Sequence, residues 1–286
     1  VAVLIIVTSV MSGFDQQLRD KILGFNAHLR VSKGGDILEN YDAVRAKICQ
    51  HPEVRGVAPV IVGPVLVETK DQAKKPMIGV PWIRGVDPKE ESKVSDLMTN
   101  VIAGSFDLEN HGVVVGVEFA RNMKLHLGDR LAIYSPETVE KWKSSEGKEA
   151  VLPEDFTVTG IFDIGYYEYN LNVIVVSLED AQELYRLDSG VHALLVKLRD
   201  PFEADTVRKQ LRGILGPEFE ISLWTESSSA LLDALAVEKN VMFYLLFFIM
   251  IVAAFGIMNS LITFVVQKTR EIGVLKALGA TRAQVL

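Results

Sequence analysis

The chain has 286 residues, of which 30 are Lys or Arg and 37 are Asp or Glu, so its formal net charge is −7. This acidic balance argues against a nucleic-acid partner, because nucleic-acid binding selects clustered positive charge. A single cysteine, Cys49, excludes an internal disulfide framework.

An apolar run opens the chain, from Val1 to Met11. About 12 helical residues reach only about 18 Å, less than the roughly 30 Å of bilayer hydrocarbon. The alternative is a signal-peptide core, but a starting Met, a basic leader and a small-residue cleavage site before Phe14 are all missing. We therefore expect residues 1–12 to be the end of a truncated first transmembrane helix.

Two strand–helix–strand units follow, one early and one late in the chain. The first unit is predicted at residues 28–31, 41–50 and 54–69, and the second at residues 193–198, 202–215 and 219–223. In the second helix Val207, Leu211 and Ile214 recur on one face. Two such units separated in sequence predict a split α+β fold, over residues 13–109 and 188–240, whose sheet both units complete.

The segment between these units, residues 110–187, predicts a small, mostly β module inserted into the first fold. Its strands are expected at residues 113–117, 131–134, 156–162 and 171–176, and its helices at residues 118–124 and 178–187. Ser177 is placed to cap the last helix, and Asp180 stands close to the capping-box position.

A long polar loop, residues 135–155, interrupts this module between two predicted strands. It is rich in Lys, Glu, Ser and Pro and has hardly any apolar periodicity. A loop of this length inside a compact domain is usually functional or disordered. Further along, Tyr166, Tyr167 and Tyr169 are typical of a core or rim position more than of a binding patch.

A second transmembrane helix is predicted at residues 241–266, which contain no charged side chain. As a helix these 26 residues measure about 39 Å, enough to cross a bilayer. Gly256 and Ser260 form a small-xxx-small pair, and Asn259 places an amide at mid-membrane depth. The three residues favour close packing against another helix, although a single such pair also arises by chance.

The last segment, residues 267–286, predicts a short helix between two turns. Ile272, Leu275 and Leu278 lie in one row, Gly279 is a plausible left-handed helix end, and residues 281–284 have capping-box spacing. A helix held between two turns is a rigid lever that passes a partner's motion to the span. The alternative is a helix on the lipid interface with its basic residues near headgroups.

The distribution of charge predicts the topology. Residues after Asn240 carry a net charge of +3, whereas residues 13–240 carry −10. Short segments rich in Lys and Arg stay cytoplasmic, while long domains translocate largely regardless of charge. We therefore expect the tail inside the cell and residues 13–240 outside the membrane.

Four stretches of the sequence resemble a known family. They are Ser9 to Phe14, Ile161 to Tyr169, Ser177 to Ala181 and, most specific of all, the run KTREIGVLKALGA from Lys268 to Ala280. The resemblance is to the lipoprotein-releasing (LolC/LolE) permeases of the MacB/FtsX-type ABC transporter superfamily, and it spans nearly the whole chain.

The resemblance implies a periplasmic domain with a Porter-like part, residues 13–109 and 188–240, and an inserted Sabre-like part, residues 110–187. It implies that the cytoplasmic tail is a coupling helix that sits on a separate ABC ATPase through Lys268, Arg270, Glu271, Ile272, Gly273, Leu275, Lys276 and Gly279. It also implies that the loop is a hook for a periplasmic lipoprotein carrier, with Pro136, Val139, Trp142, Val151 and Pro153 as candidate contacts.

The function implied is that of a non-catalytic permease subunit in the bacterial inner membrane that releases lipoproteins to a periplasmic carrier. A second permease subunit, membrane lipid and the lipoprotein substrate are further expected partners. ATP and Mg²⁺ are expected on the partner ATPase, since this chain has no GxxxxGK phosphate loop, no GxSxG elbow and no metal-ligand spacing among its histidines. The alternatives are a MacB-like efflux permease and an FtsX-like regulator of a peptidoglycan hydrolase.

Overall fold

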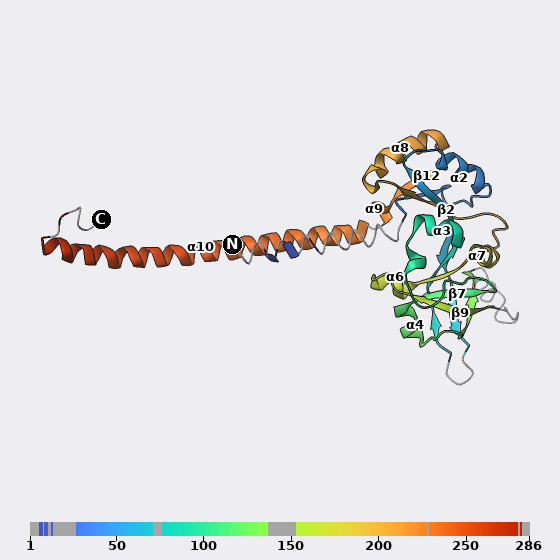
Figure 1. Ribbon diagram of the computed structural model, residues 1–286, viewed down its shortest axis with the longest axis horizontal. Helices are drawn as coiled ribbons and strands as arrows, with labels where there is room; N and C mark the ends of the chain where they lie inside the picture. The colour runs from blue at the N-terminus through green and yellow to red at the C-terminus, as the bar shows by residue number, and fades with distance from the viewer. Residues whose placement is uncertain are drawn as a thin grey trace. The chain divides into compact units, whose positions relative to one another are not determined.

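The computed structural model describes residues 27–70, 76–136, 153–227, 229–279 and 281, together with residues 6, 7, 9, 10 and 13. The chain divides into two compact units, one of Gln16–Ser228 and one of Val1–Asp15 with Ser229–Leu286 (Figure 1). We call the first unit the sheet domain, and each unit is considered by itself.

The described strands of the sheet domain form one mixed sheet of 12 strands, in the order β12-β1-β11-β2-β5-β10-β7-β9-β8-β3-β4 with β6 paired to β9. The strands are β1 (Leu29–Ser32), β2 (Val54–Pro64), β3 (Leu66–Thr69), β4 (Ile78–Gly79), β5 (Trp82–Val86), β6 (Val101–Gly104), β7 (Gly112–Gly116), β8 (Arg130–Tyr134), β9 (Glu154–Phe162), β10 (Val173–Ser177), β11 (Ala193–Leu198) and β12 (Glu220–Leu223).

The described helices differ greatly in length. They are α2 (Tyr41–Cys49), α3 (Pro88–Val94), α4 (Val117–Met123), α6 (Tyr167–Asn172), α7 (Leu178–Tyr185), α8 (Ala204–Leu215), α9 (Trp224–Ser227) and α10 (Ser229–Ala277), with short 3₁₀ turns η1 (Leu97–Asn100) and η2 (Pro201–Glu203).

The early and late strand–helix–strand units meet in one end of the sheet, as the sequence predicts. Strand β1 of the early unit pairs antiparallel with both strands of the late unit, β11 and β12, and β11 pairs with β2. The two strands of each strand–helix–strand unit are therefore parallel to each other. Between them lies one strand of the other strand–helix–strand unit. This is a split βαβ arrangement, and the α+β fold class is confirmed.

Side chains of β11 alternate between two cores on opposite faces of the sheet. Leu194 and Val196 pack with α2 and α8, whereas Ala193 and Leu195 pack with the core that includes Leu97 of η1. A third core lies around β7 to β10, where α4 and α7 contribute Phe119, Met123, Ala181 and Leu184. The sheet domain is therefore held by helices packed on both faces.

Strand β5 joins the two ends of the sheet. It pairs antiparallel with β2 and parallel with β10, and β10 continues into β7 and β9. Strands β3 and β4, although early in sequence, lie beyond β8 at the far end. The division into parts at residues 110 and 187 stays a prediction.

Two local predictions need correction. Residues 171 and 172 belong to α6 and not to a strand, because the Asn172 side chain donates to Glu168 O and closes a helical turn. Ile214 of α8 is 51 % exposed. The buried face of α8 is centred instead on Leu211 and is completed by Ala204 and Leu215, which places Ile214 at its margin.

The cap predicted at Ser177 is confirmed. Its side chain accepts a hydrogen bond from the Asp180 amide at 3.0 Å. The reciprocal contact differs from that of a capping box, because the Ser177 hydroxyl donates to Asp180 Oδ2 at 2.6 Å. The second carboxylate oxygen, Asp180 Oδ1, lies 2.8 Å from His111 Nδ1. Asp180 thus links the helix start to the loop before β7.

The second unit is dominated by α10, which is 49 residues long, or about 74 Å. Within it, Val237–Ala277 is long and apolar enough to cross a membrane, and the span predicted at residues 241–266 lies inside this range. Its large apolar side chains are exposed, for example Val252 at 71 % and Ile257 at 63 %. A core helix of a soluble domain would bury them.

Candidate functional site

The predicted ATPase-coupling residues all lie at the C-terminal end of α10 or just beyond it. Lys268 Nζ lies 2.5 Å from Glu271 Oε2 and 6.0 Å from the centre of the Phe264 ring. The Thr269 hydroxyl donates to Val265 O at 2.7 Å. These contacts tie the charged tail to the last apolar turns, so the coupling segment and the span share one axis.

The expectation of a turn between the span and the coupling helix is wrong. Helix α10 continues without a break from the apolar residues through Lys268 to Ala277. Residues 264–272 contain neither Pro nor Gly, so no residue removes an amide donor or relaxes the backbone at the junction. The predicted coupling helix is therefore the end of α10 and not a short separate helix.

The helix end predicted at Gly279 is confirmed. Gly279 has φ +94°, a left-handed conformation that glycine adopts without strain, and its amide donates to Lys276 O at 3.1 Å. Leu275 and Leu278 of the predicted row are exposed, at 48 % and 80 %. The tail thus presents an apolar row beside basic side chains. Of the expected next helix start, only Thr281 lies within the described residues.

The three predicted packing residues, Gly256, Asn259 and Ser260, lie on one side of α10 at i, i+3 and i+4 spacing. All three are exposed, and a Cβ added to Gly256 would meet no atom within 4 Å. Asn259 O accepts a hydrogen bond from the Thr263 hydroxyl at 3.0 Å. The position is open to a neighbouring helix, and packing there stays a prediction.

The predicted hook connects β8 to β9, which pair antiparallel and close with Ile133 opposite Glu154. Its base is fixed by the Tyr134 hydroxyl, which donates to Glu68 at 3.0 Å, and by an ion pair of Lys70 with Asp155. Pro136 and Pro153 are described, whereas Val139, Trp142 and Val151 lie outside the described residues.

A buried ion pair in the sheet domain was not predicted from the sequence. Arg84 Nη2 on β5 lies 2.6 Å from Glu91 Oε1 on α3, and Arg84 Nη1 donates to the Tyr169 hydroxyl on α6 at 2.9 Å. Burial acts to lower the pKa of Arg84, but the Glu91 carboxylate and Tyr169 outweigh it and hold that pKa above its ordinary value. The network joins three elements across the middle of the sheet.

The sequence does contain a signal for this pair. Arg84 is the one charged residue in the otherwise apolar run from Trp82 to Val86, and Asp87 with Pro88 marks a helix start just before Glu91. A charge inside a buried strand requires a partner of opposite sign.

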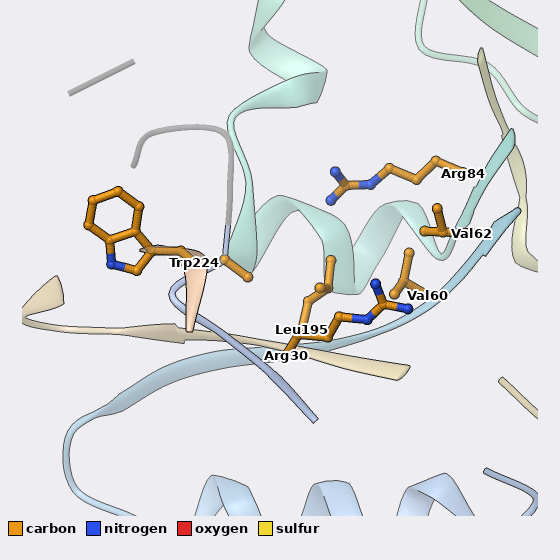
Figure 2. Close-up of a pocket in the computed structure, with 7 residues that line it drawn as sticks. Arg30, Val60, Val62, Arg84, Leu195 and Trp224 are labelled. Carbon is orange, nitrogen blue, oxygen red and sulfur yellow. The ribbon is translucent and has the colours of Figure 1, made fainter. Parts of the chain in front are cut away.

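Arg84 also lines a cavity of about 180 Å³ in the sheet domain. Figure 2 shows its other labelled walls, which are Arg30 of β1, Val60 and Val62 of β2, Leu195 of β11 and Trp224 at the start of α9. Strand register brings them together, since Arg30 is opposite Leu195 and Val62 is opposite Arg84. The cavity therefore has apolar walls and two guanidinium groups.

Comparison with known proteins matches nearly the whole chain. Residues 1–214 match the MacB-like periplasmic core domain, and residues 243–286 match the FtsX-like permease C-terminal domain. The lipoprotein-releasing system transmembrane protein LolC of Xylella fastidiosa (strain Temecula1) is 32 % identical over 289 residues, covering 100 % of this chain and 67 % of that protein. LolC of Neisseria meningitidis serogroup B (strain MC58) is 30 % identical over 300 residues, covering 100 % and 68 %.

Among solved structures, the periplasmic region of MacB from Actinobacillus actinomycetemcomitans aligns with a TM-score of 0.48 and 13 % identity, covering 74 % of this chain and 95 % of that one. The family matches and the apolar helix α10 together describe a membrane protein with a periplasmic domain. The chain belongs to the lipoprotein-releasing (LolC/LolE) permeases of the MacB/FtsX superfamily.

Proposed function

We propose that this chain is a permease subunit of a bacterial inner-membrane ABC system that releases lipoproteins to a periplasmic carrier. Residues 13–240 lie in the periplasm, and the end of α10 lies in the cytoplasm. A separate ATPase subunit binds ATP and Mg²⁺ and hydrolyses ATP, while this chain makes and breaks no bond. Its contribution is to convert the motion of the ATPase into motion of the periplasmic domain.

The observation that carries this proposal is the continuity of α10. One unbroken helix includes the apolar span and the coupling residues Lys268 to Lys276. Its sequence contains no Pro, and the only glycines are Gly256 and Gly273. A helix hydrogen-bonded along its length resists bending, so a tilt at one end is transmitted to the other, whereas a flexible linker would lose it.

The tail suits contact with an ATPase because its side chains are available. Lys268 and Glu271 are 51 % and 61 % exposed, and among the described residues each forms an ion pair only with the other. The exposed row that includes Leu275 offers apolar area for burial on a partner, and the basic residues at its rim favour an acidic partner surface. The same helix offers Gly256, Asn259 and Ser260 to a second permease subunit within the lipid.

The loop at residues 135–155 is proposed to bind the carrier. The two ends of the loop are held by the antiparallel pairing of β8 with β9. A partner that binds the loop therefore does not disturb the core. Replacing residues 139–151 by a short Gly-Ser linker in the full chain is expected to abolish carrier binding while the thermal transition of the sheet domain is kept. Unchanged carrier affinity by calorimetry would remove this assignment.

The coupling proposal is tested by two substitutions in the tail. Glu271→Lys reverses the acidic charge of the coupling segment, and Gly273→Trp adds bulk where a Cβ would meet no described atom within 4 Å apart from the adjacent helix backbone. Glu271→Lys also breaks the exposed pair with Lys268, which contributes little on its own, so a large effect on activity would come from a contact with a partner subunit. Both are expected to lower lipoprotein-stimulated ATPase activity in the assembled complex.

Glu238→Lys is the matched control, because it reverses an exposed acidic charge near the other end of α10. It is expected to leave stimulated ATPase activity unchanged. Wild-type stimulation in a complex that carries both Glu271→Lys and Gly273→Trp would contradict the coupling role and favour a tail that lies on the lipid interface.

A further inference from the structure

The segment that leads into α10 leaves the sheet domain from an edge strand. Strand β12 stands first in the sheet order and, among the described strands, pairs only with β1. Leu223, the last residue of β12, lies opposite Leu29, the first residue of β1. A strand of four residues that is paired on one side frays readily from its end. A load applied by α10 would therefore peel β12 from β1 unless the end of β12 is held.

Glu226 of α9 holds the end of β12 through both of its carboxylate oxygens. Glu226 Oε2 accepts a hydrogen bond from the Leu223 amide at 2.9 Å, which is one half of a capping box. Glu226 Oε1 lies 2.8 Å from Arg208 Nη1 on α8. A helix cap requires only the first contact. The second contact joins the end of the strand to a neighbouring helix, although the ion pair is partly exposed and contributes little alone.

His28 makes a second attachment at the same place. Its carbonyl oxygen accepts a hydrogen bond from the Trp224 amide at 3.1 Å, and its Nδ1 accepts one from the Leu198 amide of β11 at 3.1 Å. The residue is 3 % exposed, and burial lowers the pKa of its ring to about 4. Above that pH the ring is neutral, so Nδ1 remains an acceptor. His28 therefore connects the first residue after β12 to β11 and to β1, which it directly precedes.

Trp224 lies between these two attachments and is 9 % exposed. Segments that connect one element to the next usually run over the surface and are mobile. Here the chain on either side of Trp224 is instead held by three elements, which are α8 through Glu226 and β1 and β11 through His28. A load that enters at Trp224 is therefore shared among these elements.

We propose that Glu226, Trp224 and His28 form a clamp through which the motion of α10 enters the sheet domain. The inference rests on the proposed function, because it takes α10 as the element that moves. The three are positioning residues, since they act by holding the end of β12 and not by contact with ATP or lipoprotein.

The test compares Glu226→Ala with the matched control Glu220→Ala in the assembled complex. Glu220 is an exposed acidic residue at the other end of β12 and forms no ion pair within the described part of the chain. In Glu226→Ala, hydrogen exchange at the Leu223 and Trp224 amides is expected to rise by about fivefold to tenfold, because the clamp opens more often. Glu220→Ala is expected to change it by less than about twofold. Unchanged exchange in β11 would show that the sheet domain stays folded in both variants.

The second readout is the amount of a dye-labelled lipoprotein released from proteoliposomes for each ATP hydrolysed. Glu226→Ala is expected to lower this ratio by about threefold or more, while ATP hydrolysis without lipoprotein is unchanged. Glu226→Gln keeps an oxygen for the Leu223 amide but loses the charge, so its ratio is expected to fall between those of wild type and Glu226→Ala. A purely structural role would lower the amount of complex and leave the ratio unchanged.

Equal exchange at Leu223 and Trp224 in the Glu226→Ala and Glu220→Ala complexes would overturn the clamp. An equal ratio of lipoprotein released to ATP hydrolysed in the two variants would overturn it as well. If the wild-type complex released no lipoprotein, the proposed function would fail instead, and the exchange comparison would still decide whether the clamp exists.

Discussion

The sheet domain and helix α10 use the same apolar residue types in opposite ways. Phe162 and Ile174 in the sheet domain are 0 % exposed, whereas Phe255 of α10 is 61 % exposed. Two strand–helix–strand units supply enough surface to bury each other, so the sheet domain completes its own core. Helix α10 does not bury its own apolar surface, which requires contact with lipid or with another helix.

The largest expected effect compares one phenylalanine from each region. Phe162→Ala removes a fully buried ring from the sheet domain and is expected to lower its free energy of unfolding by about 3–5 kcal/mol. Phe255→Ala removes an exposed ring and is expected to change that free energy by less than about 0.5 kcal/mol. Urea unfolding of the full chain in detergent measures both. Similar losses for the two variants would break the comparison.

A smaller effect compares two ion pairs. Glu91→Gln weakens the buried contact with Arg84 and is expected to cost about 2–3 kcal/mol, because a charged hydrogen-bond partner is lost where water cannot replace it. Glu271→Gln in α10 breaks an exposed pair with Lys268 and is expected to cost less than about 0.5 kcal/mol of stability. The same unfolding measurement separates them, and an equal cost would show that the Arg84 network is not a structural link.

A further expected effect is a pH dependence within the sheet domain. Burial raises the pKa of Glu154 from 4.5 to about 7, assisted by the charges of Glu183 and Asp180 and opposed by His111. Between these values the folded state keeps a proton that the unfolded state releases, so its stability falls as pH rises from about 4.5 to 7.

Glu154→Gln is expected to remove this part of the slope. His28 acts in the opposite direction, because burial lowers its pKa to about 4 and stability is lost as pH falls from 6.5. The informative quantity is therefore the difference between wild type and variant in the unfolding midpoint across this range. If the unfolding midpoints of wild type and Glu154→Gln differed by the same amount at every pH, a raised pKa at Glu154 would be ruled out.

Local and periodic features could be predicted from the sequence. The alternation at Ala193–Leu198, the cap at Ser177 and the left-handed Gly279 all depend on a few neighbouring residues. The sequence itself contains the physical cause of each feature. The causes are the two-residue period of the strand, the side-chain acceptor of Ser177 and the missing Cβ of Gly279.

Features set by distant contacts could not be predicted in the same way. Arg84 forms its hydrogen bond with Tyr169 only after the strands are paired. The exposure of Ile214 depends on which face of α8 packs against the sheet. The length of α10 was missed because the change from apolar to charged residues at Lys268 does not end the helix, which continues to Ala277. Charge composition alone does not terminate hydrogen bonding along a helix.

The central claim is that α10 connects a periplasmic domain to a cytoplasmic coupling segment. Cysteine labelling in spheroplasts tests it directly, after exposed Cys49 is replaced by Ser. An impermeant thiol reagent is expected to label a cysteine placed at Lys148 at once, and one placed at Thr281 only after the membrane is opened. Immediate labelling of both positions would contradict the topology, and with it the coupling role of the tail.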